Sequence, residues 1–151
     1  MEMREKKVRA ATEQDMSAVA GLERQLFSDA WSESMLTDCL GQEHYALTVC
    51  VDEMGAVVGY LISTHIVGEA ELLRIGVAPE CRRQGLGLLL MGQFVRLCVE
   101  RETPDAFLEV RDSNLPAVSL YERFGFETVG RRKNYYHCPE EDARLMAGKP
   151  R

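Results

Sequence analysis

The sequence has no run of apolar residues long enough to span a bilayer, and residues 1–7 lack the apolar core of a signal peptide. It also lacks an excess of positive charge, because 24 acidic residues outnumber 18 basic ones and leave a formal net charge of −6. A nucleic-acid-binding surface needs a basic face, so this balance disfavours one, although it would suit a basic peptide partner. We therefore expect a cytoplasmic protein with no membrane contact and no direct nucleic-acid contact.

Cysteine and histidine are few and scattered along the chain. The five cysteines are an odd number without a closely spaced pair, and the three histidines form no pair on a helix face, so neither a disulfide framework nor a zinc site follows. We expect no metal and interpret Cys50 and Cys98, which lie in apolar patterns, as small core residues. Cys81 falls in a turn and is interpreted as a bystander.

The composition is otherwise that of an ordinary globular chain. With 151 residues, of which 46% are hydrophobic and 28% charged, the chain can bury a core, and we expect one domain over residues 1–151. Apolar periodicity predicts an α/β class with about four helices and a mixed sheet of about six to seven strands. The expected strands cover residues 8–10, 45–52, 57–67, 72–77, 106–110 and 126–129, with two short strands within 134–146.

Local signals refine these elements. Thr12 and Asp15 form a capping-box pattern that opens the first helix, and Ser32 is the expected N-cap of the second. Strict alternation over 45–52 predicts a half-buried strand, whereas 72–77 has the apolar character of a strand buried on both faces. The charged residues 131–133 are most simply a solvated turn.

Residues 71–99 read as a strand, a Gly-rich turn and a helix. The turn, residues 82–87, has the sequence Arg-Arg-Gln-Gly-Leu-Gly. A strand that leads through glycines into a helix presents unpaired backbone N–H groups and a positive helix end at one point, which is a phosphate cradle. The alternative is a glycine-containing helix start with two solvated arginines. The turn lacks the Lys-Ser/Thr pair that ends a P-loop motif, and it lacks the third glycine of a dinucleotide-binding motif.

A second group of residues resembles a known family. Residues 108–114 read Leu-Glu-Val-Arg-Asp-Ser-Asn, and the helix that follows carries Leu120-Tyr121 and ends in Phe-Gly-Phe. The turn matches the pattern Arg/Gln-x-x-Gly-x-Gly/Ala, and together the two groups resemble the GNAT N-acetyltransferase superfamily. The sequences of residues 108–114 and 131–136 (Arg-Arg-Lys-Asn-Tyr-Tyr) are similar to those of the RimI family. That family acetylates the N-terminal alanine of a small-subunit ribosomal protein. The resemblance implies a GNAT fold, a single largely antiparallel sheet whose splayed central strands hold acetyl-CoA.

Two side chains are the candidates for proton transfer. Moving an acetyl group from a thioester to an amine needs a neutral amine, a polarised carbonyl and a protonated leaving thiolate. The resemblance implies Glu109 as the base and Tyr121 as the acid that protonates the thiolate. The plainer interpretations are a rim glutamate at a strand end and a helix-face aromatic that only packs.

The resemblance also implies a set of acetyl-CoA contacts. Backbone groups of one strand would hold the pantetheine arm, a backbone N–H there, such as that of Val77, would hold the thioester carbonyl, and the turn would surround the pyrophosphate. Asn114 would hydrogen-bond the cofactor, unless it is an ordinary capping asparagine. The remaining contacts are Ile75, Gly76, Arg83, Gln84, Gly85, Leu86, Gly87 and Leu88.

The sequence alone does not decide the roles of several residues. Gly76 stands where relatives often have alanine, a change that we expect to be mild, and Pro116 could adjust the loop that positions Asn114. Trp31, Tyr135 and Tyr136 could line a slot for the peptide N-terminus or could simply pack.

The sequence therefore favours one function over two alternatives. The first hypothesis is an acetyl-CoA-dependent N-terminal acetyltransferase whose acceptor is the N-terminal peptide of a ribosomal protein, as a monomer or weak dimer. The second is a GNAT enzyme that acts on another peptide N-terminus, on lysine or on a small amine. The third is a non-catalytic acetyl-CoA-binding module.

Overall fold

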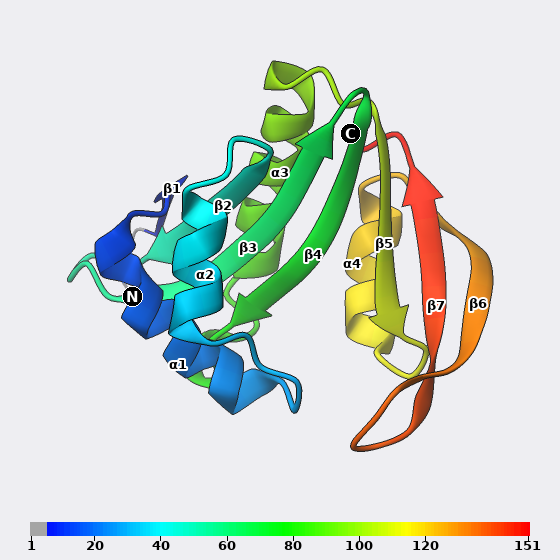
Figure 1. The fold of residues 1–151 in the computed structure, drawn as a ribbon, viewed down its shortest axis with the longest axis horizontal. Coiled ribbons are helices and arrows are strands. Elements are labelled where there is room, and N and C mark those ends of the chain that lie inside the picture. The colour runs from blue at the N-terminus through cyan, green and yellow to red at the C-terminus, as the bar shows by residue number, and fades with distance from the viewer. Residues whose placement is uncertain (1–5) are drawn as a thin grey trace. The chain divides into compact units, whose positions relative to one another are not determined.

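The computed structural model describes residues 6–151, and within them it contains seven β-strands and four α-helices (Figure 1). The helices are α1 (Met16–Leu26), α2 (Glu33–Leu40), α3 (Leu86–Glu100) and α4 (Leu115–Arg123), with 3-10 turns η1 (Glu13–Asp15) and η2 (Pro79–Cys81). The strands are β1 (Lys7–Ala10), β2 (Tyr45–Val51), β3 (Val57–Ile66), β4 (Glu69–Val77), β5 (Asp105–Arg111), β6 (Phe126–Tyr136) and β7 (Glu141–Gly148). The predicted α/β class is confirmed, whereas the signal-peptide expectation falls largely on residues 1–5, which lie outside the described residues.

The chain divides into two compact units. We call them the N-terminal unit (Met1–Ser63 with Arg74–Phe94) and the C-terminal unit (Thr64–Leu73 with Val95–Arg151). Strands β3 and β4 and helix α3 contribute residues to both units. The expectation of one domain over residues 1–151 stays a prediction.

The strands form one mixed sheet with the order β1-β2-β3-β4-β5-β7-β6. The pairs β1·β2, β5·β7 and β6·β7 are antiparallel, and β4 and β5 are parallel. The parallel ladder joins Glu69–Leu72 to Asp105–Leu108 and ends there, although β4 continues to Val77 and β5 to Arg111. A largely antiparallel sheet was predicted, and it is confirmed.

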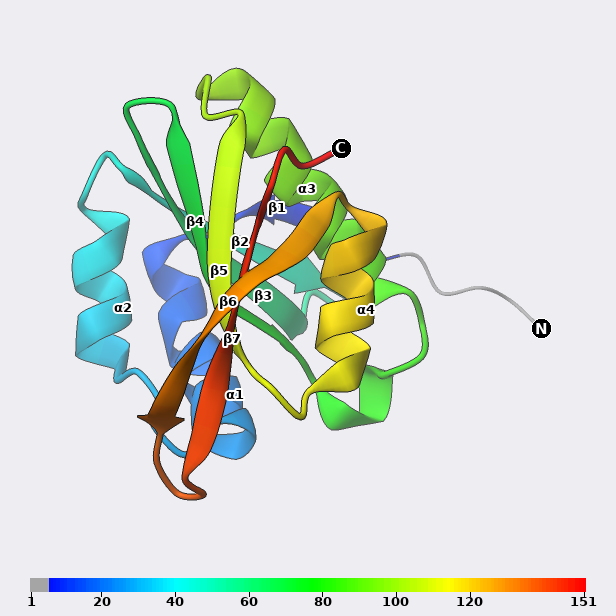
Figure 2. The same ribbon diagram turned by 90° about the vertical axis from the view of Figure 1, so that its right-hand side faces the viewer.

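In the N-terminal unit, β2 is buried on both faces, so the prediction of a half-buried strand was wrong. Thr48 and Cys50, which alternation assigned to the solvent face, are 3% and 0% exposed. Helices α1 and α2 lie on one side of strands β2 and β3, and α3 lies on the other, where Leu90 packs against Gly59 (Figures 1 and 2). Alternation marks a solvent face only where no second layer covers the sheet.

The predicted capping box opens the 3-10 turn η1, which leads directly into α1. The backbone N–H of Thr12 donates to Asp15 Oδ2 at 2.7 Å, and Arg9 donates two hydrogen bonds to the same carboxylate, at 2.7 and 2.9 Å. Helix α2 begins as predicted too, because Ser32 Oγ accepts from the backbone N–H of Met35. The hydrogen bonds of Arg9 and Thr12 lower the pKa of Asp15 to about 2.

This shift predicts a pH-dependent stability. The folded pKa of Asp15 lies below its ordinary value of 3.8, so its carboxylate stabilises the fold above that value and loses the effect as the pH falls towards 2. Because Arg9 is 43% exposed, we expect Asp15→Asn to lower the free energy of unfolding by only about 1–2 kcal/mol at pH 7. Urea unfolding of both proteins between pH 7 and pH 3 should show the difference shrinking with acidity. A difference independent of pH would contradict this assignment.

In the C-terminal unit, α4 packs its buried residues Val118 and Tyr121 inward. Gly125 follows the C-cap residue Phe124, and its φ of 95° suits glycine. Residues 131–133 are exposed, as predicted, but the prediction that they form a turn was wrong. These residues lie inside β6, where Arg131 pairs with Arg144 and Arg132 with Ala143 of β7. Pairing along β7 therefore overrides the local preference of three consecutive charges for a turn.

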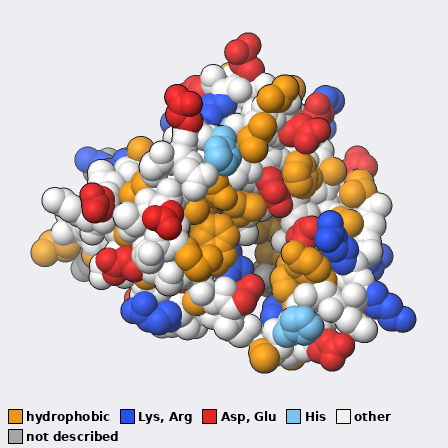
Figure 3. Space-filling model, in the orientation of Figure 1, with side chains coloured by type: hydrophobic (Ala, Val, Ile, Leu, Met, Phe, Trp, Pro, Cys, Tyr) orange, Lys and Arg blue, Asp and Glu red, His pale blue; other side chains and the backbone are white. Residues whose placement is uncertain are grey.

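Strand β4 is buried on one face only, so its assignment to a doubly buried strand was also wrong. Ala70 and Leu72 are buried, whereas Leu73, Ile75 and Val77 on the other face are half-buried. Cys50 and Cys98 are buried, as predicted. Among residues 6–151, no helix is both long and apolar enough to cross a membrane. On the face shown in Figure 3, Lys and Arg side chains are scattered among acidic ones and form no continuous basic surface.

Candidate active site

The Gly-rich turn of the N-terminal unit has the geometry of an anion-binding helix start. Arg83 and Gly85 have φ values of 66° and 78°, and a side chain at Gly85 would point into open space. The backbone N–H of Leu89 donates to Gly85 O at 3.2 Å, so the first helical turn follows Gly85. The N–H groups of residues 86–88 therefore have no intrahelical acceptor. Buried Leu86 anchors this turn while residues 82–85 are exposed.

Strand β4 reaches this turn through Ile75, Gly76 and Val77. A Cβ at Gly76 would lie 2.7 Å from three atoms of the Tyr60 side chain, which is 1% exposed. Gly76, which has no side chain, thus leaves room for the large buried ring of Tyr60 on β3. An alanine at this position would overpack the ring unless the ring moved.

We predict that Gly76→Ala lowers the free energy of unfolding by about 1–3 kcal/mol, because the extra methyl group overpacks the Tyr60 ring. The matched control is Gly92→Ala in α3, where no atom lies within 4 Å of the new Cβ. Alanine is the better helix former, so this control should be neutral or stabilising by up to about 1 kcal/mol. Equal stability of the two variants in urea unfolding would contradict the packing argument.

Glu109 lies on β5 in the C-terminal unit and forms the centre of a charged cluster. Its side chain is 22% exposed and its Oε1 lies 3.4 Å from Nε of Arg132. Tyr135 also hydrogen-bonds Glu109, and this bond with partial burial raises the pKa of Tyr135. Glu109 is therefore not a solitary rim glutamate but a carboxylate oriented by two groups of β6.

A second carboxylate stands near the first. Glu71 of β4 pairs with Phe107, which shares a face with Glu109, so both carboxylates lie on one face of the sheet. Burial and the charge of Glu109 raise the pKa of Glu71, and Arg132 opposes this effect. Sequence reasoning missed Glu71 and missed the contact between Arg132 and Glu109. The parallel pairing of β4 with β5 is the signal that could have identified Glu71.

Tyr121 lies on α4 and is 4% exposed. Its ring meets that of Phe126 edge to face, with 6.1 Å between the centroids. Burial, and to a lesser degree Tyr136, raise the pKa of Tyr121 above its usual value of 10.0. The phenol is therefore protonated throughout the physiological range and can donate, but it releases its proton only to a strongly basic partner.

Asn114 caps α4, as its plainer interpretation predicted. Its Oδ1 accepts from the backbone N–H of Ala117 at 3.3 Å, and Pro116 fits in the first turn. Capping occupies the side-chain oxygen, so the amide nitrogen can still serve a ligand. The preceding loop is fixed by Glu141, which accepts from the backbone N–H of Ser113 at 2.6 Å.

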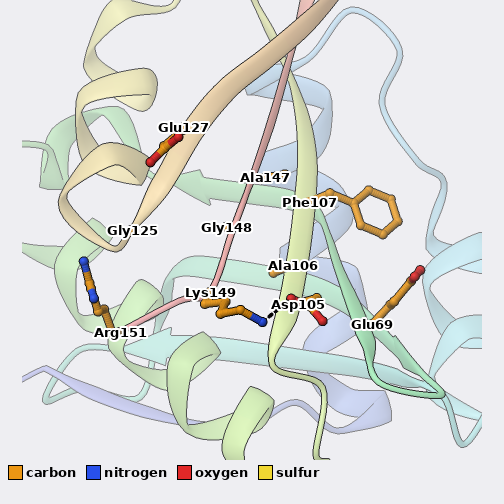
Figure 4. Close-up of a pocket in the computed structure, with 10 residues that line it drawn as sticks. All are labelled: Glu69, Asp105, Ala106, Phe107, Gly125, Glu127, Ala147, Gly148, Lys149 and Arg151. Atoms are coloured by element: carbon orange, nitrogen blue, oxygen red, sulfur yellow. Dashed lines mark hydrogen bonds and ion pairs between the residues drawn. The ribbon is translucent and has the colours of Figure 1, made fainter.

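Two further features of the described residues are a pocket that the predicted site residues do not line and the arrangement of potential metal ligands. A pocket of about 500 Å³ lies in the C-terminal unit, and two of its lining residues, Asp105 and Lys149, form an ion pair at 2.6 Å. Figure 4 shows the residues that line it. None of the residues predicted for acetyl transfer lines this pocket. Within residues 6–151, no group of three or more His, Cys, Asp or Glu side chains is arranged to hold a metal ion.

Comparison with known proteins agrees with the fold and motifs. The family model described as acetyltransferase (GNAT) family matches residues 16–126. The ribosomal protein bS18-alanine N-acetyltransferase of Escherichia coli (strain K12) is 33% identical over 135 residues, which cover 88% of this chain and 90% of the relative. A Bacillus subtilis (strain 168) protein, to which its name assigns the same activity provisionally, is 35% identical over 88% of both chains.

A solved structure gives the same result. The crystal structure of the ribosomal-protein-S18-alanine N-acetyltransferase from Escherichia coli superposes with a TM-score of 0.88 at 30% identity, and the match covers 97% of this chain and 94% of that one. Sheet, turn and helices thus define an acyltransferase fold. The chain belongs to the acetyltransferase (GNAT) family, and the prediction of an N-acetyltransferase is confirmed.

Proposed function

We propose that this protein transfers the acetyl group of acetyl-CoA to the α-amino group of the N-terminal alanine of ribosomal protein bS18. The observation that carries the proposal is the oriented carboxylate of Glu109, with Arg132 at 3.4 Å, in a chain 33% identical to relatives named for this reaction. Two carboxylates on one sheet face suit an acceptor that arrives as a cationic ammonium. We place the protein in the cytoplasm with this acceptor, as a monomer or weak dimer.

The end of strand β4 and the Gly-rich turn fit acetyl-CoA, which supplies the activated thioester. The cradle has exposed residues at 82–85, open space beside Gly85 and N–H groups at 86–88 that need acceptors, as a pyrophosphate provides. Ile75 to Val77 would hold the pantetheine arm with backbone groups, and the N–H of Val77 would stabilise the thioester oxygen as it gains charge. The amide nitrogen of Asn114 would contribute a further hydrogen bond.

Glu109 then acts as the base of the transfer. An α-amino group has a pKa near 8, so about a tenth of it is neutral at pH 7 without help. When that nitrogen bonds to the thioester carbon it becomes strongly acidic, and Glu109 accepts its proton. As the carbon–sulfur bond breaks, Tyr121 donates its proton to the leaving sulfur. The high proton affinity of Tyr121 makes this donation late, when the sulfur carries most of its charge.

The experiment that tests this proposal compares matched acceptors. Release of the CoA thiol is measured with a peptide of the bS18 N-terminus, the same peptide with a blocked α-amino group, and a free polyamine. We expect turnover only with the first. Turnover with the polyamine alone would favour a small-amine enzyme, and acetyl-CoA binding without turnover on any acceptor would favour a non-catalytic module.

The cradle makes a separate prediction about cofactor affinity. We expect Gly85→Ala to weaken acetyl-CoA binding by about tenfold, because an L-residue resists the φ of 78° and shifts the N–H groups that follow. Gly55→Ala is the matched control, since Gly55 has a φ of 84° and equally open space in a turn between β2 and β3. Both variants should lose similar stability, but only Gly85→Ala should change the calorimetric Kd. Unchanged affinity in Gly85→Ala would remove the cradle from the cofactor site.

A further inference from the structure

A buried carboxylate in the N-terminal unit organises the segment between α1 and α2. Glu23, at 0% exposure, accepts hydrogen bonds on both oxygens. Oε1 accepts from the backbone N–H of Trp31 at 2.9 Å and from Nε of Arg74 at 3.2 Å, and Oε2 accepts from the Tyr60 hydroxyl at 2.5 Å. Donors from three places thus converge on the Glu23 carboxylate: the segment just before α2, strand β3 and strand β4.

Arg74 extends this network to the surface of the same segment. Its Nη2 donates to the backbone O of Asp29 at 2.8 Å and to its Oδ1 at 3.0 Å. The guanidinium also lies over the Phe27 ring, 4.1 Å from its centroid, and 5.8 Å from that of Trp31. The arginine side chain is only 11% exposed, so these contacts occur largely out of water, where they are strongest.

The network joins a strand segment that the proposed function uses to the chain segment between α1 and α2. Arg74 immediately precedes Ile75, and the Tyr60 ring packs against Gly76, so the strand segment expected to hold acetyl-CoA shares its supports with residues 27–31. Phe27 and Trp31 are half-buried and do not belong to the buried core. Their rings are therefore fixed by a guanidinium and keep part of their surface available to a ligand.

We infer that Arg74 is a positioning residue for the acceptor, which holds Phe27 and Trp31 in place as one wall of the slot for the peptide N-terminus. This inference rests on the proposed function, because it assigns the acceptor side of that same reaction. Lysine would not replace the arginine, since one ammonium cannot reach Glu23 and Asp29 together or lie flat over a ring.

The protein offers a direct probe of this segment, because Trp31 is its single tryptophan. We expect Arg74→Gln to raise acrylamide quenching of Trp31 fluorescence and to raise the KM for the bS18 peptide by about tenfold or more. The calorimetric Kd for acetyl-CoA should change by less than about twofold. Arg74→Lys, the variant that keeps the charge, should give intermediate values.

Arg9→Gln is the matched control, since Arg9 also forms a two-point ion pair in this unit, but with Asp15. It should leave both Trp31 quenching and the peptide KM unchanged. Arg74 variants that match the wild type in quenching or in KM would overturn the inference, and so would Arg74→Lys at wild-type values. Failure of the proposed function would appear differently, as a wild-type protein without peptide turnover, whereas the quenching comparison would still report on Arg74.

Discussion

Glu109→Gln should lower kcat with the bS18 peptide by about 10²–10⁴-fold, the range that a positioned general base supplies. Glutamine keeps the size of the side chain and can still contact Arg132 and Tyr135, but it cannot accept the proton that the nitrogen releases. The Kd for acetyl-CoA should be unchanged, because the cradle lies elsewhere in the chain. Stopped-flow release of the CoA thiol under saturating acetyl-CoA measures the effect.

The matched control for this variant is Glu69→Gln. Glu69 lies on β4 two residues before Glu71, is exposed, and has no part in the proposed reaction. Its substitution removes the same charge from the neighbouring strand and should change kcat by less than about twofold. Equal activity of Glu109→Gln and Glu69→Gln would show that Glu109 is not the base and that the cluster around it is structural.

Tyr121→Phe should lower kcat by about 10²-fold at pH 7, because only the donor hydroxyl is lost. The aromatic ring stays and can keep its edge-to-face contact with Phe126. A thiol has a pKa near 8.5, so the leaving sulfur needs a proton less as the pH rises. The deficit of the variant should therefore narrow above about pH 8.5, while the raised pKa of Tyr121 keeps the wild-type donor protonated.

Thermal unfolding separates this role from simple packing. Tyr121→Phe should unfold within a few degrees of the wild type, since a hydroxyl-to-hydrogen change leaves the buried ring in place. Val118→Ala, one turn earlier on the same helix face, should lower stability but spare kcat in the fraction that remains folded. A Tyr121→Phe variant with full activity at every pH would make Tyr121 a packing residue only.

Much of this fold follows from local signals in the sequence. The capping box at Thr12, the N-cap at Ser32 and the glycine stop at Gly125 act within one helical turn, so each can be read from neighbouring residues. The buried stripe of α3 and the strand β5 follow from periodicity in the same way.

The features that the sequence did not yield depend on distant partners. Residues 131–133 look like a turn until β7 pairs with them, and β2 looks half-exposed until helices cover both faces. The contact between Arg74 and Glu23 joins residues 51 positions apart, and Glu71 approaches Glu109 only through a parallel ladder. Register and layering therefore decide which charges gather, and no window along the chain contains that information.

The measurement that tests the central claim most directly is mass spectrometry of unacetylated bS18 protein incubated with acetyl-CoA and either wild-type protein or Glu109→Gln. Fragmentation of the product identifies the acetylated nitrogen. We predict a single acetyl group on the α-amino group of the N-terminal alanine with the wild type, and none with the variant in the same time. Acetyl groups on lysine side chains, or equal modification by both proteins, would contradict the account.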